Sequence, residues 1–191
     1  MPNWCNNTVE INHEDPAKMT ALVEAINKGE FCNYAIPVPE SLKIVAGRVG
    51  DDTDPEQIKL QEQTMNNLSV YGYANWYDFC VGKWGTKWDV EAYDTVEYDG
   101  KNGVTFGFDS AWAPPVGIYD ALVEQGFTVR AYYYEPGMAF AGVWEDGYDD
   151  EYSLGGMTST QAREDLPKEL DEMFGISDGI AEYEAEEAEE E

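Results

Sequence analysis

Positively charged residues are scarce in this sequence. Its 191 residues include 11 Lys and Arg against 39 Asp and Glu, which gives a formal net charge of −28. A surface of this charge repels phosphate backbones and anionic lipid headgroups, and it attracts basic partners over about 8–10 Å at physiological salt. The composition therefore argues against direct binding of nucleic acid through a basic face and against attachment to an anionic membrane.

Histidine and cysteine are nearly absent. His13 is the single histidine, and Cys5, Cys32 and Cys80 are far apart with no C-x-x-C pair. This pattern predicts no disulfide framework. No two of these four residues stand at metal-ligand spacing, so we expect the cysteines to be small buried hydrophobic side chains. The sequence predicts no metal site and no cofactor.

Long apolar runs and catalytic motifs are also missing. No stretch approaches the roughly 20 apolar residues that span a bilayer. The opening MPNWCNNTVE has neither the basic segment nor the apolar core of a secretory signal, so we expect a cytoplasmic protein. No G-x-S-x-G, Walker A, H-E-x-x-H or G-x-G-x-x-G motif occurs, and so many acidic residues make any carboxylate pair uninformative. We predict no catalytic residues and a protein that is not an enzyme.

Periodic apolar patterns, by contrast, are plentiful. Residues 4–11 alternate in polarity, which predicts a strand. Residues 15–29 carry a helical apolar stripe with Asp15 and Pro16 at its start and Gly29 after its end, which predicts a helix. The same criteria predict helices beginning at Asp54 and at 76–84, 113–126 and 165–175, and strands at 88–98, 104–108, 127–135 and 138–145. We expect Asp165 to cap the last helix and residues 145–151, EDGYDDE, to form a polar loop.

The order of these elements predicts an α+β fold. Without residues 30–87 and the last strand it reads β-α-β-β-α-β, the split β-α-β order of ferredoxin-like folds, with an antiparallel sheet and both helices on one face. We predict a ferredoxin-like domain at 1–150 with a helical insertion at about 30–87, a short helical extension at 151–177 and an acidic disordered tail at 178–191.

Five segments together resemble one family: MPNWCNNTVEI, IPVPE, WYDFCVGKWGTKWDV, AWAPPVGIYDALVEQG and YYYEPGMAFAGVWEDG. They are similar to the YubB-like family of phage- and plasmid-borne proteins, over residues 1 to about 150. The resemblance implies a ferredoxin-like domain without an iron–sulfur cluster and an origin in a mobile element. It implies no catalytic residues.

The stretch KWGTKWD, residues 83–89, brings two indoles and two cations together. In a functional interpretation, Trp84 and Trp88 stack on a base or sugar ring while Lys83 or Lys87 holds a phosphate or carboxylate. This alternative describes a small-ligand or nucleotide-binding protein, including an enzyme. In a structural interpretation, Trp84 ends a helix and Trp88 begins a strand that packs beneath it. We favour the structural interpretation.

Exposed aromatic and acidic residues supply the candidate partner-binding surfaces. Tyr132 and Tyr134 fall on the strand face opposite Tyr133, where they could contact another protein. The acidic candidates form two groups: Asp89, Glu91 and Glu97 on a predicted strand face, and Glu145, Asp146, Asp149, Asp150 and Glu151 in the predicted loop.

An ordered array of carboxylates can imitate the charge of a DNA duplex and occupy a basic channel. With the mobile-element resemblance, the charge predicts a non-enzymatic phage or plasmid protein. Its predicted partner is a basic host protein that handles nucleic acid, such as a restriction or CRISPR nuclease, which it inhibits as a DNA mimic. Two other interpretations remain open: acidity that only gives solubility, and a structural protein that forms homo-oligomers.

Overall fold

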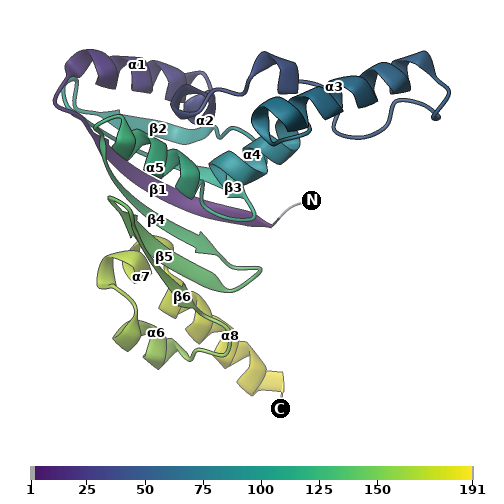
Figure 1. The fold of residues 1–191 in the computed structure, drawn as a ribbon. Helices are drawn as coiled ribbons and strands as arrows, with labels where there is room; N and C mark the ends of the chain where they lie inside the picture. The colour runs from purple at the N-terminus through teal and green to yellow at the C-terminus, as the bar shows by residue number, and fades with distance from the viewer. Residues whose placement is uncertain (1–2, 191) are drawn as a thin grey trace.

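A six-stranded antiparallel sheet forms the centre of the structure, a computed structural model that describes residues 3–190 (Figure 1). The strands lie in the order β2-β3-β1-β4-β5-β6. Their bounds are β1 Trp4–Asn12, β2 Ala92–Tyr98, β3 Gly103–Ala111, β4 Thr128–Glu135, β5 Phe140–Glu145 and β6 Tyr148–Ser153. The predicted α+β class and antiparallel sheet are confirmed, whereas the ferredoxin-like assignment stays a prediction.

Helices cover both faces of this sheet (Figure 1). One face packs against α1 (Pro16–Asn27), α2 (Phe31–Ala35), α4 (Trp76–Trp84) and α5 (Val116–Glu124). The other face packs against α6 (Ser159–Asp165), α7 (Lys168–Phe174) and α8 (Ile176–Glu190). The short 3₁₀ helix η1 (Glu40–Leu42) and α3 (Pro55–Tyr71) extend to one side, far from α8. Among the described residues 3–190, no helix combines the length and apolar character that crossing a bilayer requires.

The helices α1, α3 and α4 begin where the sequence predicts, whereas the short α2 was not predicted. Asp15 accepts a hydrogen bond from the Ala17 amide at 2.9 Å, and Asp54 accepts one from the Glu56 amide at 2.8 Å. A proline follows each cap, where its fixed φ suits the first helical turn. The helix α4 ends at Gly85, whose φ of 86° is the left-handed conformation that glycine adopts without steric cost.

The first core confirms the alternation predicted for β1. Val9 and Ile11 are fully buried on the face that α1 and α5 cover. The polar Asn7 shares this face, and its buried amide donates to Ser110 Oγ at 2.8 Å and accepts from Tyr119 Oη at 3.3 Å. Because these groups satisfy one another, the polar side chain is accommodated without an unpaired buried group.

The predicted loop at 145–151 is instead a β-hairpin. Glu145 pairs with Tyr148, so only Asp146 and Gly147 connect β5 to β6. Both residues have positive φ, 44° and 98°, as in the type I′ turns that suit the twist of antiparallel strands. The Asp-Gly dipeptide was therefore a usable hairpin signal, and reading the segment as a loop because of its acidity was wrong.

The second face of the sheet is covered, so the prediction of an exposed tyrosine surface is also wrong. Tyr132 is only 3% exposed, and its hydroxyl donates to Glu169 Oε2 at 2.7 Å. It packs in a second apolar cluster with Leu170 and Ile176, and Tyr134 lies at the edge of that cluster. The alternation of Tyr132 and Tyr133 thus serves two cores, one on each side of the sheet.

The C-terminal segment differs from the prediction in two ways. Asp165 ends α6 rather than capping α7, and α6 is itself capped by Thr158, which exchanges hydrogen bonds with Gln161. The region expected to be a disordered tail forms α8 as far as Glu190, and residue 191 lies outside the described residues. Packing supplies the stability that composition alone does not predict: Ile176 is buried and Ile180 contacts the second cluster.

Hydrogen bonds from Ser159 to Glu184 hold α8 against the start of α6, and they change the pKa of Glu184 in a way that can be tested. The Ser159 hydroxyl and amide donate to Glu184 at 2.7 and 2.9 Å, and these hydrogen bonds lower the pKa of the Glu184 carboxyl. Since the folded pKa is lowered, the stabilisation is present above the usual glutamate value of about 4.3 and is lost as pH falls through the lower folded value. In a carboxyl-detected NMR titration, Ser159→Ala is expected to raise the Glu184 pKa; an unchanged titration curve would contradict this contact.

Candidate functional site

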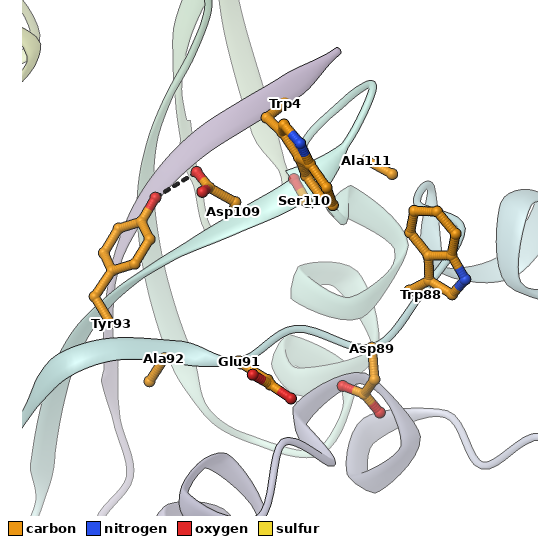
Figure 2. A pocket seen from close by; sticks show the side chains of 9 residues that line it. All are labelled: Trp4, Trp88, Asp89, Glu91, Ala92, Tyr93, Asp109, Ser110 and Ala111. Carbon is orange, nitrogen blue, oxygen red and sulfur yellow. Dashed lines mark hydrogen bonds between the residues drawn. The ribbon is translucent and has the colours of Figure 1, made fainter. Parts of the chain in front are cut away.

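A pocket of about 390 Å³ opens at the end of the sheet where β1 begins and β3 ends (Figure 2). Three parts of the chain line it: the start of β1, the segment that leads into β2, and the last residues of β3. We call it the tryptophan pocket. Its lining residues are Trp4, Trp88, Asp89, Glu91, Ala92, Tyr93, Asp109, Ser110 and Ala111.

Two exposed indoles form part of its wall. Trp4 and Trp88 are 45% and 41% exposed, and their ring centroids lie 6.1 Å apart at an interplanar angle of 32°. Trp4 is opposite Ala111 in the β1–β3 pair, on the strand face opposite the buried Cys5. Trp88 lies after the turn at Gly85. The pairing of Trp4 with Ala111 and the hydrogen bonds of Thr86 to Ala111, at 2.9 and 3.2 Å, bring together two indoles from distant parts of the sequence.

The structure does not bring all three residues of the predicted ligand site together, because Trp84 is buried apart from Lys87 and Trp88. Trp84 is 3% exposed, and its Nε1 donates to the Ile36 carbonyl at 2.9 Å, which fits the structural role that we favoured. Trp88 does not begin a strand beneath α4, because β2 begins at Ala92 and the Trp88 indole is exposed. Lys87 is not a lining residue of the tryptophan pocket.

The Lys87 ammonium is surrounded by aromatic rings instead. Its Nζ lies 4.2 Å from the ring centroid of Trp88, 5.5 Å from that of Tyr77 and 5.9 Å from that of Trp112. Such contacts are electrostatically favourable cation–π interactions. The lysine that the sequence suggested as an anion-binding group is therefore engaged within its own chain.

Asp89 is a helix cap rather than part of an outward acidic face. Its Oδ1 accepts from the Cys32 amide at 2.7 Å and its Oδ2 from the Asn33 amide at 2.9 Å, at the start of α2. Burial raises the pKa of its carboxyl, against the opposing effect of these backbone hydrogen bonds. The prediction that Asp89 offers a charge to a partner is wrong, because both of its oxygens are used within the chain.

Asp109 is the carboxylate that sequence analysis missed. Its Oδ1 accepts from Asn6 Nδ2 at 2.6 Å and from the Tyr93 hydroxyl (Figure 2). Burial and the hydrogen bond to Asp109 both raise the pKa of Tyr93, so this hydroxyl stays a donor at neutral pH. The alternation of β3 predicts Asp109 on the face opposite the core, but its partners come from β1 and β2 and depend on strand pairing.

The other predicted acidic residues lie at opposite edges of the sheet. Glu91 and Glu97 are exposed near and on β2, at one edge. The second group runs from the end of β5 through the turn into β6, at the other edge. The structure therefore does not bring the two groups together.

Within the second group, several carboxylates have partners in the same chain. Asp146 Oδ1 accepts from the Val129 amide at 2.9 Å, and Asp149 Oδ1 accepts from the Tyr133 hydroxyl at 2.7 Å. Glu145 Oε2 lies 3.7 Å from the Arg130 Nε. Asp150 and Glu151 are exposed on the edge strand β6. Only part of the predicted group is thus an outward array.

A more regular acidic surface lies on α8. Six acidic residues occur from Asp178 to Glu189, and all six are exposed. Their span is about 17 Å at 1.5 Å per residue, which gives roughly one charge per 3 Å. We call this set the α8 acidic surface; it comprises Asp178, Glu182, Glu184, Glu186, Glu187 and Glu189. These charges lie in the segment predicted to be a disordered tail, for which no fixed arrangement is expected.

Within residues 3–190, no three carboxylate, thiol or imidazole groups gather closely enough to hold a metal ion. The three described cysteines are buried, and burial raises the pKa of Cys5 and of Cys80 to about 12. Because a thiolate is the reactive form, these thiols are unreactive at neutral pH.

Comparisons with known proteins give little further information. No protein-family model matches the sequence, and no curated protein matches it. Among solved structures, the chain is similar to a crystal structure of a protein api92 from Yersinia pseudotuberculosis, described with the family DUF1281. The alignment has 14% sequence identity, covers 82% of this chain and 100% of the other, and has a TM-score of 0.39. A likeness of this size carries no argument about function.

Proposed function

We propose that this protein is a non-enzymatic binding protein of a phage or other mobile element, which occupies a basic nucleic-acid channel of a host protein as a DNA mimic. The α8 acidic surface is the observation that carries the proposal. Along the helix axis its roughly one charge per 3 Å is comparable to the one charge per roughly 3.4 Å of a single DNA strand. Because an α-helix turns about 100° per residue, Asp178, Glu182, Glu186 and Glu189 recur every three or four residues and share one face of α8, whereas Glu184 and Glu187 lie on other faces.

The surface is also largely free of competing cations. Of the α8 carboxylates, Asp178 pairs with Arg163 at 3.0 Å. Among the residues that the structure describes, no basic group forms an ion pair with Glu182, Glu186 or Glu189. Their charge is therefore available to a cationic partner. A role in the host cytoplasm and a YubB-like origin belong to the same proposal.

The test uses a purified restriction endonuclease or CRISPR effector nuclease with a basic DNA channel. We expect binding that weakens at least about tenfold from 50 to 200 mM salt and that duplex DNA competes away. The triple variant Glu182→Gln, Glu186→Gln and Glu189→Gln should weaken binding by about tenfold or more, because it removes three adjacent charges from the contact surface.

A matched control separates the α8 acidic surface from net charge. Glu14→Gln, Glu56→Gln and Glu62→Gln remove the same charge from exposed positions near α1 and on α3, at the other side of the molecule (Figure 1). This variant should change the affinity by less than about threefold. Salt-insensitive binding, or equal losses in the two triple variants, would count against DNA mimicry.

A further inference from the structure

We propose that the tryptophan pocket binds the guanidinium group of an arginine side chain, because it places two exposed indoles beside carboxylates and has no basic lining residue. This inference concerns a different surface from the α8 acidic surface and goes beyond the proposed function. It also reverses the charge of ligand that the sequence suggested, from an anion held by Lys87 to a cation.

The aromatic wall supplies the first half of the recognition. Trp4 and Trp88 keep 45% and 41% of their surface exposed at the pocket, although indoles are among the side chains that gain most from burial. The face of an indole attracts cations, and the planar guanidinium group stacks on it while its edge stays free to donate hydrogen bonds. The Lys87 ammonium, 4.2 Å from the Trp88 centroid, already occupies one face of that ring, so a ligand guanidinium would stack on Trp4 or on the other face of Trp88.

The charges supply the second half. The lining residues include no lysine or arginine, and two of them, Glu91 and Asp109, are carboxylates apart from the helix-capping Asp89. Glu91 comes from the segment before β2 and Asp109 from β3, and Figure 2 shows them on different sides of the pocket. These carboxylates would repel an anionic ligand and attract a cation that lies against the exposed Trp4 ring.

The hydrogen bonds around Asp109 prepare it to accept from a ligand. Its two donors, Asn6 Nδ2 and the Tyr93 hydroxyl, both reach Oδ1 from neighbouring strands. They hold the carboxylate in one orientation and give Oδ2 no donor among the described residues. A guanidinium group presents several N–H groups in a fixed plane, so it can donate to this oxygen and to Glu91 while it stacks on an indole. A lysine ammonium lacks the plane that the stack requires.

Titration of ¹⁵N-labelled protein with N-acetyl-L-arginine methylamide tests the inference through the indole N–H signals. We expect saturable shifts at Trp4 and Trp88, with a dissociation constant in the range of about 1–10 mM for so small a ligand. The citrulline analogue has the same shape but is neutral, and it should bind at least about fivefold more weakly. Equal binding of the two ligands would overturn the proposal.

Variants then locate the site. Trp88→Ala and Asp109→Asn should each weaken binding about three- to tenfold. Two controls remove a comparable group elsewhere: Tyr148→Ala, an aromatic ring that is 79% exposed, and Glu24→Gln, an exposed carboxylate on α1. Both should bind arginine within about twofold of the unaltered protein. Unchanged binding in Trp88→Ala, or shifts that follow α8 instead of the pocket, would overturn the proposal.

The same titration separates this inference from the proposed function. The triple α8 variant should bind the arginine derivative normally, because its substitutions lie far from the tryptophan pocket. Loss of nuclease binding with intact arginine binding would affect DNA mimicry alone, and the reverse result would affect the pocket alone.

Discussion

Replacing Gly117 with alanine is expected to lower the free energy of unfolding by about 3 kcal/mol. Gly117 lies in the first turn of α5, where the backbone of α4 passes close by. A Cβ atom there would overlap the carbonyl oxygen of Lys83 and come within 3.0 Å of its carbonyl carbon. Because the obstacle is backbone rather than a side chain that can rotate, the two helices would have to separate.

Urea denaturation measures this cost, with Gly155→Ala as the matched control. A Cβ at Gly155 would have no heavy atom within 4 Å, so this variant should stay within about 0.5 kcal/mol of the unaltered protein. Equal midpoints for the two variants would show that α4 and α5 are not in close contact. The packing matters for the tryptophan pocket because Trp88 follows α4 by only four residues.

Replacing Leu170 with alanine is expected to cost about 3 kcal/mol and to loosen the C-terminal helices selectively. Leu170 is fully buried on α7, at the centre of the cluster that joins Tyr132 to Ile176. The substitution removes three carbon atoms and leaves a cavity between α7 and the sheet. Since the first core lies on the other face, its packing should be unaffected.

Hydrogen exchange distinguishes a local loss of stability in the C-terminal helices from a global one. The amides of α6, α7 and α8 should exchange faster in Leu170→Ala, while those of β1 keep their protection. Met173→Ala is the control on the same helix, because Met173 is 40% exposed and should cost less than about 1 kcal/mol. Equal acceleration in β1 and α8 would mean that the two cores unfold as one unit. The result bears on function, because the α8 acidic surface is ordered only while α8 stays docked.

Particular elements show how far the sequence goes. Asp15 with Pro16, and Asp54 with Pro55, marked two helix starts correctly because a cap acts on the amides of the next turn and needs no other part of the chain. The Asp-Gly turn before β6 is the same kind of local signal. It was not used, because the acidic residues around it favoured the prediction of a loop. Both faces of β1 could likewise be assigned from alternation alone.

The structure of the C-terminal region was harder to predict from the sequence, for a physical reason. Residues 178–190 have few apolar side chains, so their composition predicts disorder. Their order comes from contacts with the rest of the chain: Ile180 meets the second cluster, and Ser159 donates to Glu184. Such contacts are set by the fold and leave no periodic trace strong enough to identify from sequence.

The residues of the tryptophan pocket show the same contrast between local sequence signals and long-range contacts. Composition and local pattern were enough to predict the α+β class, the surplus of negative charge and the starts of α1, α3 and α4, because these depend on residue content and on residues within a turn of each other. Only the tertiary structure shows that Trp88 meets Trp4 and that Asp109 lines the same pocket. Asp109 and Trp4 are placed by the pairing of β1 with β3, which joins Trp4 to Ala111 and Asn6 to Asp109, residues more than a hundred positions apart, and Thr86 holds the segment of Trp88 to Ala111.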